Sequence, residues 1–195
     1  AAQIALSNAN LQANAIDLII GAAAVPYQTI PATAPALQRA LKISDGECFA
    51  LDMNCTCLSF LAALQFAEAV LQAGTYQYVL IVSSEIASRA LPWENQPEVA
   101  GLFGDGAAAC LVKKSVDKRL FASQFSTHAS AYDSCSLAAG GTRFDFEKEF
   151  ALFSAHSEFS MDGKELFRIT AKHFSGFVDG LLEKADTRHD KIDRV

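Results

Sequence analysis

The sequence predicts an α/β protein with a largely parallel sheet, and three observations support this class. Apolar runs at residues 16–23, 48–54 and 78–84 alternate with segments of helical spacing. Each run is almost continuously apolar, as is typical of strands in a parallel sheet that is covered on both faces. A chain of 195 residues, 51% of them hydrophobic, can also bury the sizeable core that such a layered domain needs.

The predicted elements follow from local periodicity and from glycine punctuation. Helices are expected at residues 1–9, 31–41, 58–73 and 161–184, with a helix–loop segment at 86–100. Strands are expected at residues 16–23, 48–54, 78–84, 101–112 and 121–128, the last two as a hairpin. The helix at 161–184 is amphipathic, with Leu166, Ile169, Phe174, Phe177 and Leu181 at core-like spacing. Residues 129–155, rich in glycine and aromatics, stay unassigned, and loops of this size are usually functional or mobile.

The composition excludes several classes of protein. The net charge of −6, with scattered Lys and Arg, gives no basic patch of the kind that binds nucleic acid. No apolar run reaches the roughly 18 residues of a membrane span, and the N-terminus lacks the pattern of a signal peptide. An odd number of cysteines in apolar surroundings indicates free thiols in a reducing compartment, so a cytoplasmic protein is expected. Cys48 and Cys110 lie in apolar runs and are expected to be small core residues.

The most informative residue is Cys57, between the predicted buried strand at 48–54 and the predicted helix at 58–73. A thiol at this position lies at the positive end of a helix dipole, beside free backbone N–H groups. Both features favour the thiolate, which is the reactive form of cysteine. Cys55 lies only two residues earlier, so two thiols compete for the role of nucleophile.

Four segments resemble the thiolase superfamily, and more narrowly its beta-ketoacyl-acyl-carrier-protein synthase III branch. Residues 52–60 (DMNCTCLSF) resemble the nucleophile segment of that family, and residues 78–89 resemble the strand and helix that follow it. Residues 103–112 (FGDGAAACLV) resemble its Gly-Asp-Gly-Ala strand entry, and residues 161–167 (MDGKELF) resemble the start of a later helix. The segments occur in the order and spacing of the family.

The resemblance implies a three-layer α/β/α half of a thiolase-like fold with a mixed, mostly parallel five-stranded sheet. Residues 1–195 are then one N-terminal domain, trimmed at both ends, without the C-terminal catalytic half. In the family a second, similar half packs on the first, and two subunits pair through the strand next to the nucleophile. A homodimer is therefore expected.

The resemblance also implies the chemistry of an acyltransferase. Cys57 would accept an acyl group from an acyl-CoA or acyl-carrier-protein thioester, and a malonyl thioester would then lose carbon dioxide and condense with it. The backbone N–H of Cys57 would contribute to an oxyanion hole. This chemistry, in fatty-acid or related biosynthesis, needs no cofactor and no metal. The family takes its catalytic His and Asn from the second half, so this chain alone is expected to be inactive.

Cys55 falls where the family usually has a small residue. We expect it to lie in the strand with its side chain in the core. The alternative is a Cys-X-Cys metal or redox pair, which is disfavoured because the sequence offers no second ligand pair at zinc-like spacing.

Four further residues match substrate-binding positions of the family. Ile30 matches a position where this branch often places a bulky aromatic that reaches into the partner subunit's acyl pocket, so the smaller Ile suggests a longer or branched acyl primer. Phe103, Met161 and Gly163 match positions lining the channel for the thioester arm. Ordinary apolar packing remains the alternative for Ile30, Phe103 and Met161. Asp105, between two glycines, is expected to fix its turn through local backbone bonds, and Asp52 to do the same at the strand end.

Two departures from the family pattern limit the prediction. Where the family often carries a basic residue that meets coenzyme A, residues 94–100 contain two acids, which leaves room for a carrier-protein donor. None of the four histidines lies in the catalytic motif: His173 and His189 are expected at the surface, and His128 and His156 stay unassigned.

Other functions remain open alternatives. A condensing enzyme of secondary metabolism, of polyketide or quinolone type, shares the nucleophile arrangement. A non-catalytic partner subunit of such a synthase is disfavoured by the presence of Cys57, because such subunits usually lose the nucleophile. A generic α/β domain with buried thiols is the third alternative.

Overall fold

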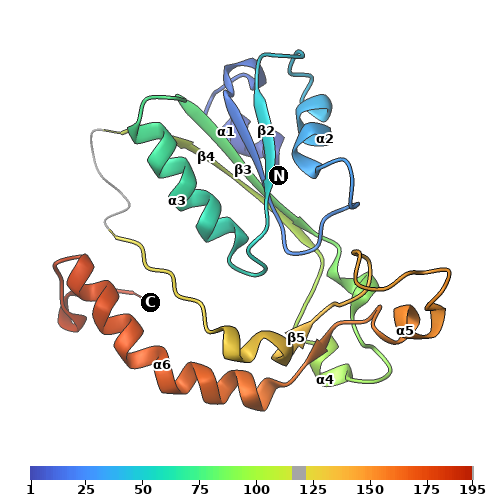
Figure 1. The fold of residues 1–195 in the computed structure, drawn as a ribbon. Helices are drawn as coiled ribbons and strands as arrows, with labels where there is room; N and C mark the ends of the chain where they lie inside the picture. Colours follow the sequence, from blue (N-terminus) through green and yellow to red (C-terminus); the bar gives the residue numbers. More distant parts are fainter. Residues whose placement is uncertain (116–121, 195) are drawn as a thin grey trace. The chain divides into compact units, whose positions relative to one another are not determined.

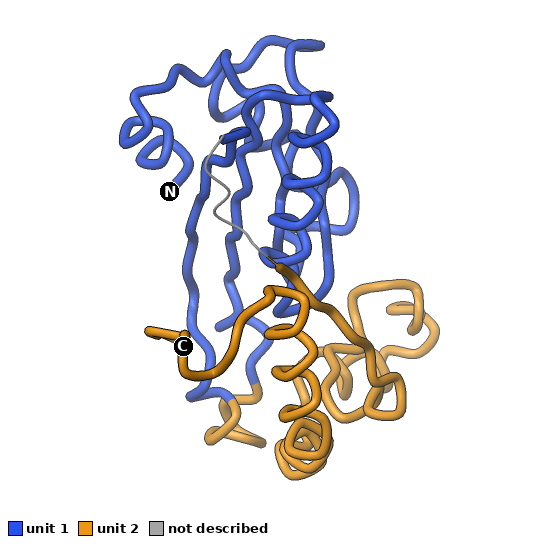
Figure 2. The backbone as a smooth tube through the Cα atoms, turned by 90° about the vertical axis from the view of Figure 1, so that its left-hand side faces the viewer, with its two compact units in different colours: residues 1–91, 100–115 blue, residues 92–99, 116–195 orange. Residues whose placement is uncertain are grey.

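The computed structural model describes residues 1–115 and 122–194, which divide into two compact units. Unit 1 contains residues 1–91 and 100–115 (Figure 2). Unit 2 contains residues 92–99 and the described residues from 122 onward. Each unit is described below by itself.

Unit 1 is built on a four-stranded sheet in the order β2-β1-β3-β4. The strands are β1 (Leu18–Ala22), β2 (Phe49–Met53), β3 (Tyr78–Glu85) and β4 (Gly106–Lys113). β1 pairs in parallel with both β2 and β3, and β4 runs antiparallel to β3. Each residue of β1 is buried, which explains its continuous apolar sequence. The predicted α/β class, with a mixed and mostly parallel sheet, is confirmed.

Helices cover both faces of this sheet (Figure 1). α1 (Ala2–Asn8) and α2 (Thr33–Ala40) contribute Leu6 and Ala34 to a core cluster with Ile19 and Leu80. α3 (Ser59–Gln72) packs on the opposite face. Its contact residues Ala63 and Ala67 are fully buried, and their small side chains allow close approach to the strands. The predicted three layers are therefore present in unit 1.

Two predictions about the sheet were wrong. The sheet has four strands, because residues 122–128 are described but are not a strand; Phe121 of that predicted strand lies outside the described residues. β2 is not the buried strand that was predicted, because it lies at the edge of the sheet and Phe49 and Asp52 are exposed. Among the described residues, the outer edge of β2 has no neighbouring strand.

Unit 2 contains short elements and one long helix. A two-stranded antiparallel ladder joins β5 (Cys135–Ser136) to β6 (Ser160–Met161), and two helices are α5 (Phe150–Ala155) and α6 (Gly163–Lys184). The side chain of Asp162 caps α6 by accepting the N–H of Glu165 at 3.0 Å. The predicted long helix is confirmed, but Phe174 is exposed and the other predicted core positions on α6 are only half-buried. The remaining elements of the chain are α4 (Pro97–Ala100) and the 3₁₀ turns Ala13–Ala15, Ala87–Ala90, Ala129–Ser134 and His189–Lys191.

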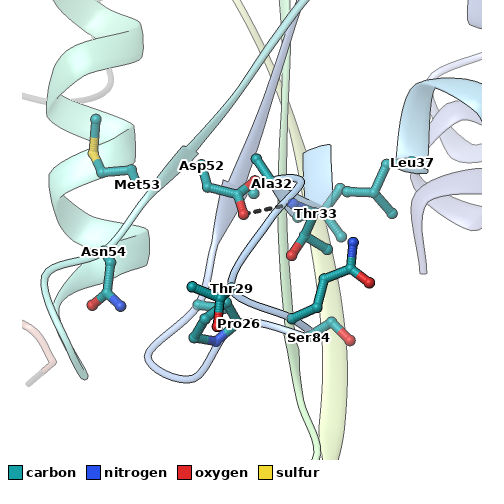
Figure 3. A pocket seen from close by; sticks show the side chains of 13 residues that line it. Pro26, Thr29, Ala32, Thr33, Leu37, Asp52, Met53, Asn54 and Ser84 are labelled. Carbon is teal, nitrogen blue, oxygen red and sulfur yellow. Dashed lines mark hydrogen bonds between the residues drawn. The ribbon is translucent and has the colours of Figure 1, made fainter. Parts of the chain in front are cut away.

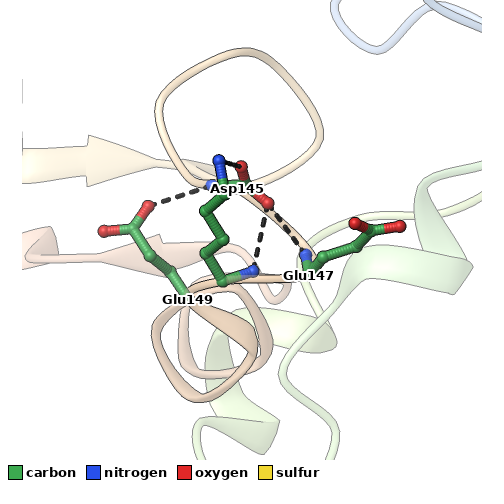
Figure 4. A network of polar contacts seen from close by, with 4 residues as sticks. Asp145, Glu147 and Glu149 are labelled. Carbon is green, nitrogen blue, oxygen red and sulfur yellow. Dashed lines mark hydrogen bonds and ion pairs between the residues drawn. The ribbon is translucent and has the colours of Figure 1, made fainter.

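A polar network shapes part of the segment that the sequence left unassigned (Figure 4). Asp145 Oδ1 accepts the N–H groups of Glu147 and Lys148 at 3.0 and 3.1 Å, while its own N–H donates to Glu149 Oε2 at 3.0 Å. The hydrogen bond from Lys148 is the main cause that lowers the pKa of Asp145. This reciprocal arrangement resembles a capping box, and it starts the turn that leads into α5.

We expect Gly176→Ala to stabilise the protein. Gly176 lies in the interior of α6, and a Cβ there would meet no atom within 4 Å. Alanine is favoured over glycine in helices by about 1 kcal/mol, so the free energy of unfolding in urea should rise by up to that amount. Gly180→Ala is the matched control, since its Cβ would lie 3.1 Å from Nε2 of Gln124, which donates to the Phe177 carbonyl. An equal gain in both variants would contradict this account.

Candidate active site

A strained turn joins β2 to α3 and carries Cys57. The N–H of Leu58 donates to the carbonyl of Cys55 at 3.1 Å, which closes a four-residue turn over residues 55–58. Thr56, its first central residue, has a φ of 53°. A positive φ is rare for a β-branched residue, and such strain persists where the surrounding structure enforces it, often at functional sites. The turn places Cys57 immediately before the first turn of α3.

Hydrogen bonds from both sides hold this turn. Asn54 Oδ1 accepts the N–H of Thr56 at 2.9 Å. From the other side, Ser59 Oγ accepts the N–H of Cys55 at 2.9 Å and donates to the Thr56 carbonyl at 2.6 Å. Ser59 is itself buried, which limits its freedom to leave this position. These bonds enforce the positive φ of Thr56.

The same residues connect the turn to the loop that follows β1. Asn54 Nδ2 donates to the Ala24 carbonyl at 2.9 Å, and Ser59 Oγ lies 3.3 Å from the Ala23 carbonyl. Glu85, at the end of β3, accepts the N–H groups of Ala24 and Val25. The loop, the turn and Glu85 therefore meet at the carboxyl ends of three parallel strands. This is the edge where ligands bind in open α/β sheets.

The structure corrects the expected position of Cys55. Its side chain was expected in the core, but both Cys55 and Cys57 are exposed. The cause is that β2 ends at Met53, so that Cys55 belongs to the turn at an edge strand. Cys48 and Cys110 are half-buried, which agrees in part with their predicted core position, and burial raises the pKa of both thiols.

A cavity of about 290 Å³ lies beside the turn, at the same edge of unit 1 (Figure 3). Gly21 and Asp52 line it from the strands, Thr29 and Thr33 from the loop and α2, and Asn54 from the start of the turn. Asn54 thus contacts both the cavity and the turn, whereas Cys57 is not among the lining residues.

Asp52 and Asp105 act over longer distances than the sequence predicted. Asp52 caps α2, because its two carboxylate oxygens accept the N–H groups of Thr33 and Ala34 at 2.7 Å each (Figure 3). Asp105 accepts the N–H and the hydroxyl of Ser88 at 2.8 Å each, and these bonds lower the pKa of its carboxyl. Neither aspartate bonds only its local backbone as expected. The inferred structural role is supported, with partners 17 to 19 residues away.

Comparison with known proteins identifies the family. The family model for 3-oxoacyl-[acyl-carrier-protein] synthase III matches residues 51–129, which include the turn with Cys57, β3 and β4. A beta-ketoacyl-[acyl-carrier-protein] synthase III of Streptococcus pyogenes serotype M6 is 32% identical over 188 residues, covering 96% of this chain and 56% of that relative. The chain belongs to the 3-oxoacyl-[acyl-carrier-protein] synthase III family.

Solved structures agree with this assignment. The synthase III of Aquifex aeolicus superposes with a TM-score of 0.81 at 30% identity, covering 98% of this chain and 56% of that one. A 3-oxoacyl-(acyl-carrier protein) synthase from Burkholderia xenovorans gives a TM-score of 0.79 at 25% identity, with 98% and 55% covered. The chain thus spans about half the length of the curated relatives it matches.

The predicted substrate residues of the chain fall in both units. Ile30 is 84% exposed on the loop that is hydrogen-bonded to the Cys57 turn, so ordinary packing within the described residues is excluded. Phe103 is 36% exposed in unit 1. Met161 is half-buried in β6 and Gly163 begins α6, both in unit 2. A channel shared by these residues stays a prediction.

All four histidines of the chain lie in unit 2, so unit 1 supplies none beside Cys57. His173 and His189 are exposed, as predicted. The rings of His128 and His173 stack at 4.1 Å, and desolvation, followed by the neighbouring His128 and Lys172 charges, lowers the pKa of His173. Within residues 1–115 and 122–194, no group of three or more His, Cys, Asp or Glu side chains could hold a metal ion.

The sequence reasoning missed Asn54, Ser59 and Glu85, which position the turn that carries Cys57 and its neighbouring loop. A signal for two of them was present. Asn and Ser readily bond backbone groups at turns and helix starts, and both flank the two cysteines at the boundary of the predicted strand and helix. Glu85 gave no such signal, because its partners lie 60 residues or more earlier in the chain.

Proposed function

We propose that this chain carries the nucleophile of a synthase III-type condensing acyltransferase in fatty-acid or related biosynthesis. Cys57 accepts an acyl group, which then undergoes decarboxylative Claisen condensation with a malonyl thioester. One observation carries the proposal. The exposed Cys57 lies in a strained turn before α3 that is held by hydrogen bonds from Asn54 and Ser59, inside the segment that matches the family model.

The first half-reaction uses groups of unit 1. The Cys57 thiolate attacks the carbonyl carbon of an acyl thioester, the tetrahedral oxyanion collapses, and the donor thiolate leaves with its electron pair. The backbone N–H of Cys57, held by the turn, is one oxyanion donor that does not reorganise during the reaction. The positive end of α3 stabilises negative charge that develops on the thioester oxygen at this place.

The second half-reaction needs groups that unit 1 does not supply. Loss of carbon dioxide from a malonyl thioester leaves an enolate, which requires hydrogen-bond donors beside Cys57. Unit 1 contains no histidine. We therefore expect the 195-residue chain alone to become acylated without releasing a 3-oxoacyl product.

The proposed partners are thioesters and a second copy of this chain. Glu94 and Glu98 stand where a basic residue would meet the phosphates of coenzyme A, which supports a carrier-protein donor alongside acyl-CoA. The outer edge of β2, without a neighbour among the described residues, supports pairing of two subunits through that strand. The free thiols support a reducing compartment such as the cytoplasm. No helix within the described part of the chain is long and apolar enough to cross a membrane.

The experiment that tests this function is acylation of the 195-residue chain. The reduced protein is incubated with acyl-CoA, and separately with the acyl-carrier-protein thioester, and its intact mass is measured. We expect one acyl group per chain, removable by hydroxylamine as a thioester and located by peptide mapping to Cys57. An unacylated Cys57 with both donors would overturn the proposal.

Ile30→Phe is expected to shorten the accepted acyl chain. The exposed Ile30 side chain is proposed to limit the acyl pocket of the partner subunit, and a larger ring would fill the space that long chains need. The ratio of acylation rates, long-chain over acetyl donor, should fall by about tenfold or more. Ile30→Val, which only removes bulk, is the matched control and should leave the ratio unchanged or raised. An unchanged ratio in Ile30→Phe would contradict the assignment.

A further inference from the structure

We propose that Cys55 and Cys57 form a reversible oxidation site, in which Cys55 traps oxidised Cys57 as a disulfide. The chemistry concerns the two thiols alone. Its consequence, that the disulfide withdraws the acyl-accepting nucleophile from reaction, rests on the proposed function of Cys57.

The geometry of the turn brings the two residues together. Cys55 and Cys57 flank Thr56 in the tight turn over residues 55–58. Even a fully extended chain separates such Cα atoms by only about 7 Å. The positive φ of Thr56 and the bond from Leu58 to Cys55 fold the segment into a tight turn, which shortens that separation. A disulfide requires a Cα separation of about 4.4 to 6.8 Å, so the turn favours closure.

Exposure distinguishes this pair from the other thiols of unit 1. Cys55 and Cys57 are both exposed, so that an oxidant reaches either sulfur. Cys48 and Cys110 are half-buried, and burial raises the pKa of each, which lowers their thiolate content. The sequence disfavoured a Cys-X-Cys pair because it offers no second ligand pair at zinc-like spacing. That argument weighs against a metal site and does not bear on a disulfide between the two thiols.

The proposed steps are balanced with a hydroperoxide as oxidant. The Cys57 thiolate attacks the peroxide, a sulfur–oxygen bond forms, the oxygen–oxygen bond breaks, and the departing alkoxide or hydroxide takes up a proton. The Cys55 sulfur then attacks the sulfenic acid, the sulfur–sulfur bond forms, and hydroxide leaves with the proton of Cys55 as water. The two thiols thus supply the two electrons that reduce the peroxide. A dithiol reverses the product by thiol–disulfide exchange.

Without a resolving thiol, a second equivalent of peroxide oxidises the sulfenic acid to sulfinic acid and a third oxidises that to sulfonic acid, and dithiols restore neither. The second thiol, two residues from Cys57, therefore keeps oxidation at Cys57 reversible.

The test uses the 195-residue chain with hydrogen peroxide as the probe. The reduced protein is treated with one equivalent of peroxide, free thiols are blocked with N-ethylmaleimide, and peptides are mapped by mass spectrometry. We expect a peptide lighter by two hydrogens that contains both Cys55 and Cys57 unblocked, with Cys48 and Cys110 blocked. Dithiothreitol should restore labelling of both sulfurs. Circular dichroism confirms that each variant is folded.

Two matched variants complete the experiment. In a second treatment with at least three equivalents of peroxide, Cys57 of Cys55→Ser should become sulfinic or sulfonic acid that dithiothreitol does not restore. Cys110→Ser should behave like the unmodified sequence. The proposal is overturned if the unmodified chain loses Cys57 irreversibly while Cys55 stays free, or if disulfides join only separate chains. Acylation of the reduced protein is measured in parallel. If the disulfide forms but the reduced chain is never acylated, the result contradicts the proposed function and still supports the oxidation site.

Discussion

Replacing Cys57 with Ser should abolish formation of the acyl adduct on this chain. A serine hydroxyl is a much weaker nucleophile than a thiolate, and unit 1 offers no histidine to take its proton. We expect the acylation rate, measured by intact mass under single-turnover conditions, to fall by roughly three orders of magnitude or more.

Cys55→Ser is the matched control for this prediction. It changes the same atom type in the same exposed turn, two residues away, and keeps a small side chain. Its acylation rate should equal that of the unmodified chain, because Cys55 does not take part in acyl transfer. An acyl group that maps to Cys55, or an adduct that persists in Cys57→Ser, would contradict the assignment of the nucleophile.

Gly21→Ala should destabilise unit 1, because the added methyl group would clash with the carboxylate of Asp52. A Cβ at Gly21 would lie 2.6 Å from Asp52 Oδ1, and that carboxylate is held by the N–H groups of Thr33 and Ala34. The added methyl group must therefore displace either the cap of α2 or the pairing of β1 with β2. We expect the free energy of unfolding in urea to fall by about 1–3 kcal/mol.

A double-mutant cycle shows whether the clash is with Asp52. Asp52→Ala alone removes the cap of α2 and should cost about 1 kcal/mol. In the Asp52→Ala background, Gly21→Ala should cost much less, because the clashing oxygen is absent. Gly104→Ala is the control, since a Cβ there meets no atom within 4 Å. Additive effects of the two substitutions would contradict the proposed clash.

Local pattern predicted most of unit 1. β1 and β3 lie at the centre of the sheet and are covered on both faces, and their sequences are accordingly continuous apolar runs. α3 follows from helical spacing that ends at Gly74, whose φ is 76°. Residues 129–155 could not be assigned from the sequence. Their conformation depends on side-chain hydrogen bonds such as those of Asp145, and such bonds give no periodic pattern in the sequence.

The wrong predictions for β2, Cys55 and the two aspartates share a cause. The sequence of one strand does not show whether that strand lies at the centre or at the edge of its sheet, or which distant segments it will contact. β2 has an apolar sequence, yet it lies at the edge, so its residues are partly exposed. Cys55 was assigned to the core by continuing that strand for two residues, whereas the chain turns away after Met53. The partners of Asp52 and Asp105 also lie on distant segments that only folding brings near.

The sequence by itself determined the α/β class and the family resemblance, because these depend on residue types and spacing along single segments. It also predicted Cys57 as the nucleophile, which stays a prediction. Only the tertiary structure decided that β2 is an edge strand, that Asn54, Ser59 and Glu85 hold the turn and its loop, and that Cys55 is exposed beside Cys57. Burial and hydrogen bonding at each of these positions depend on neighbours from other parts of the chain, and those neighbours are defined only once the strands have paired.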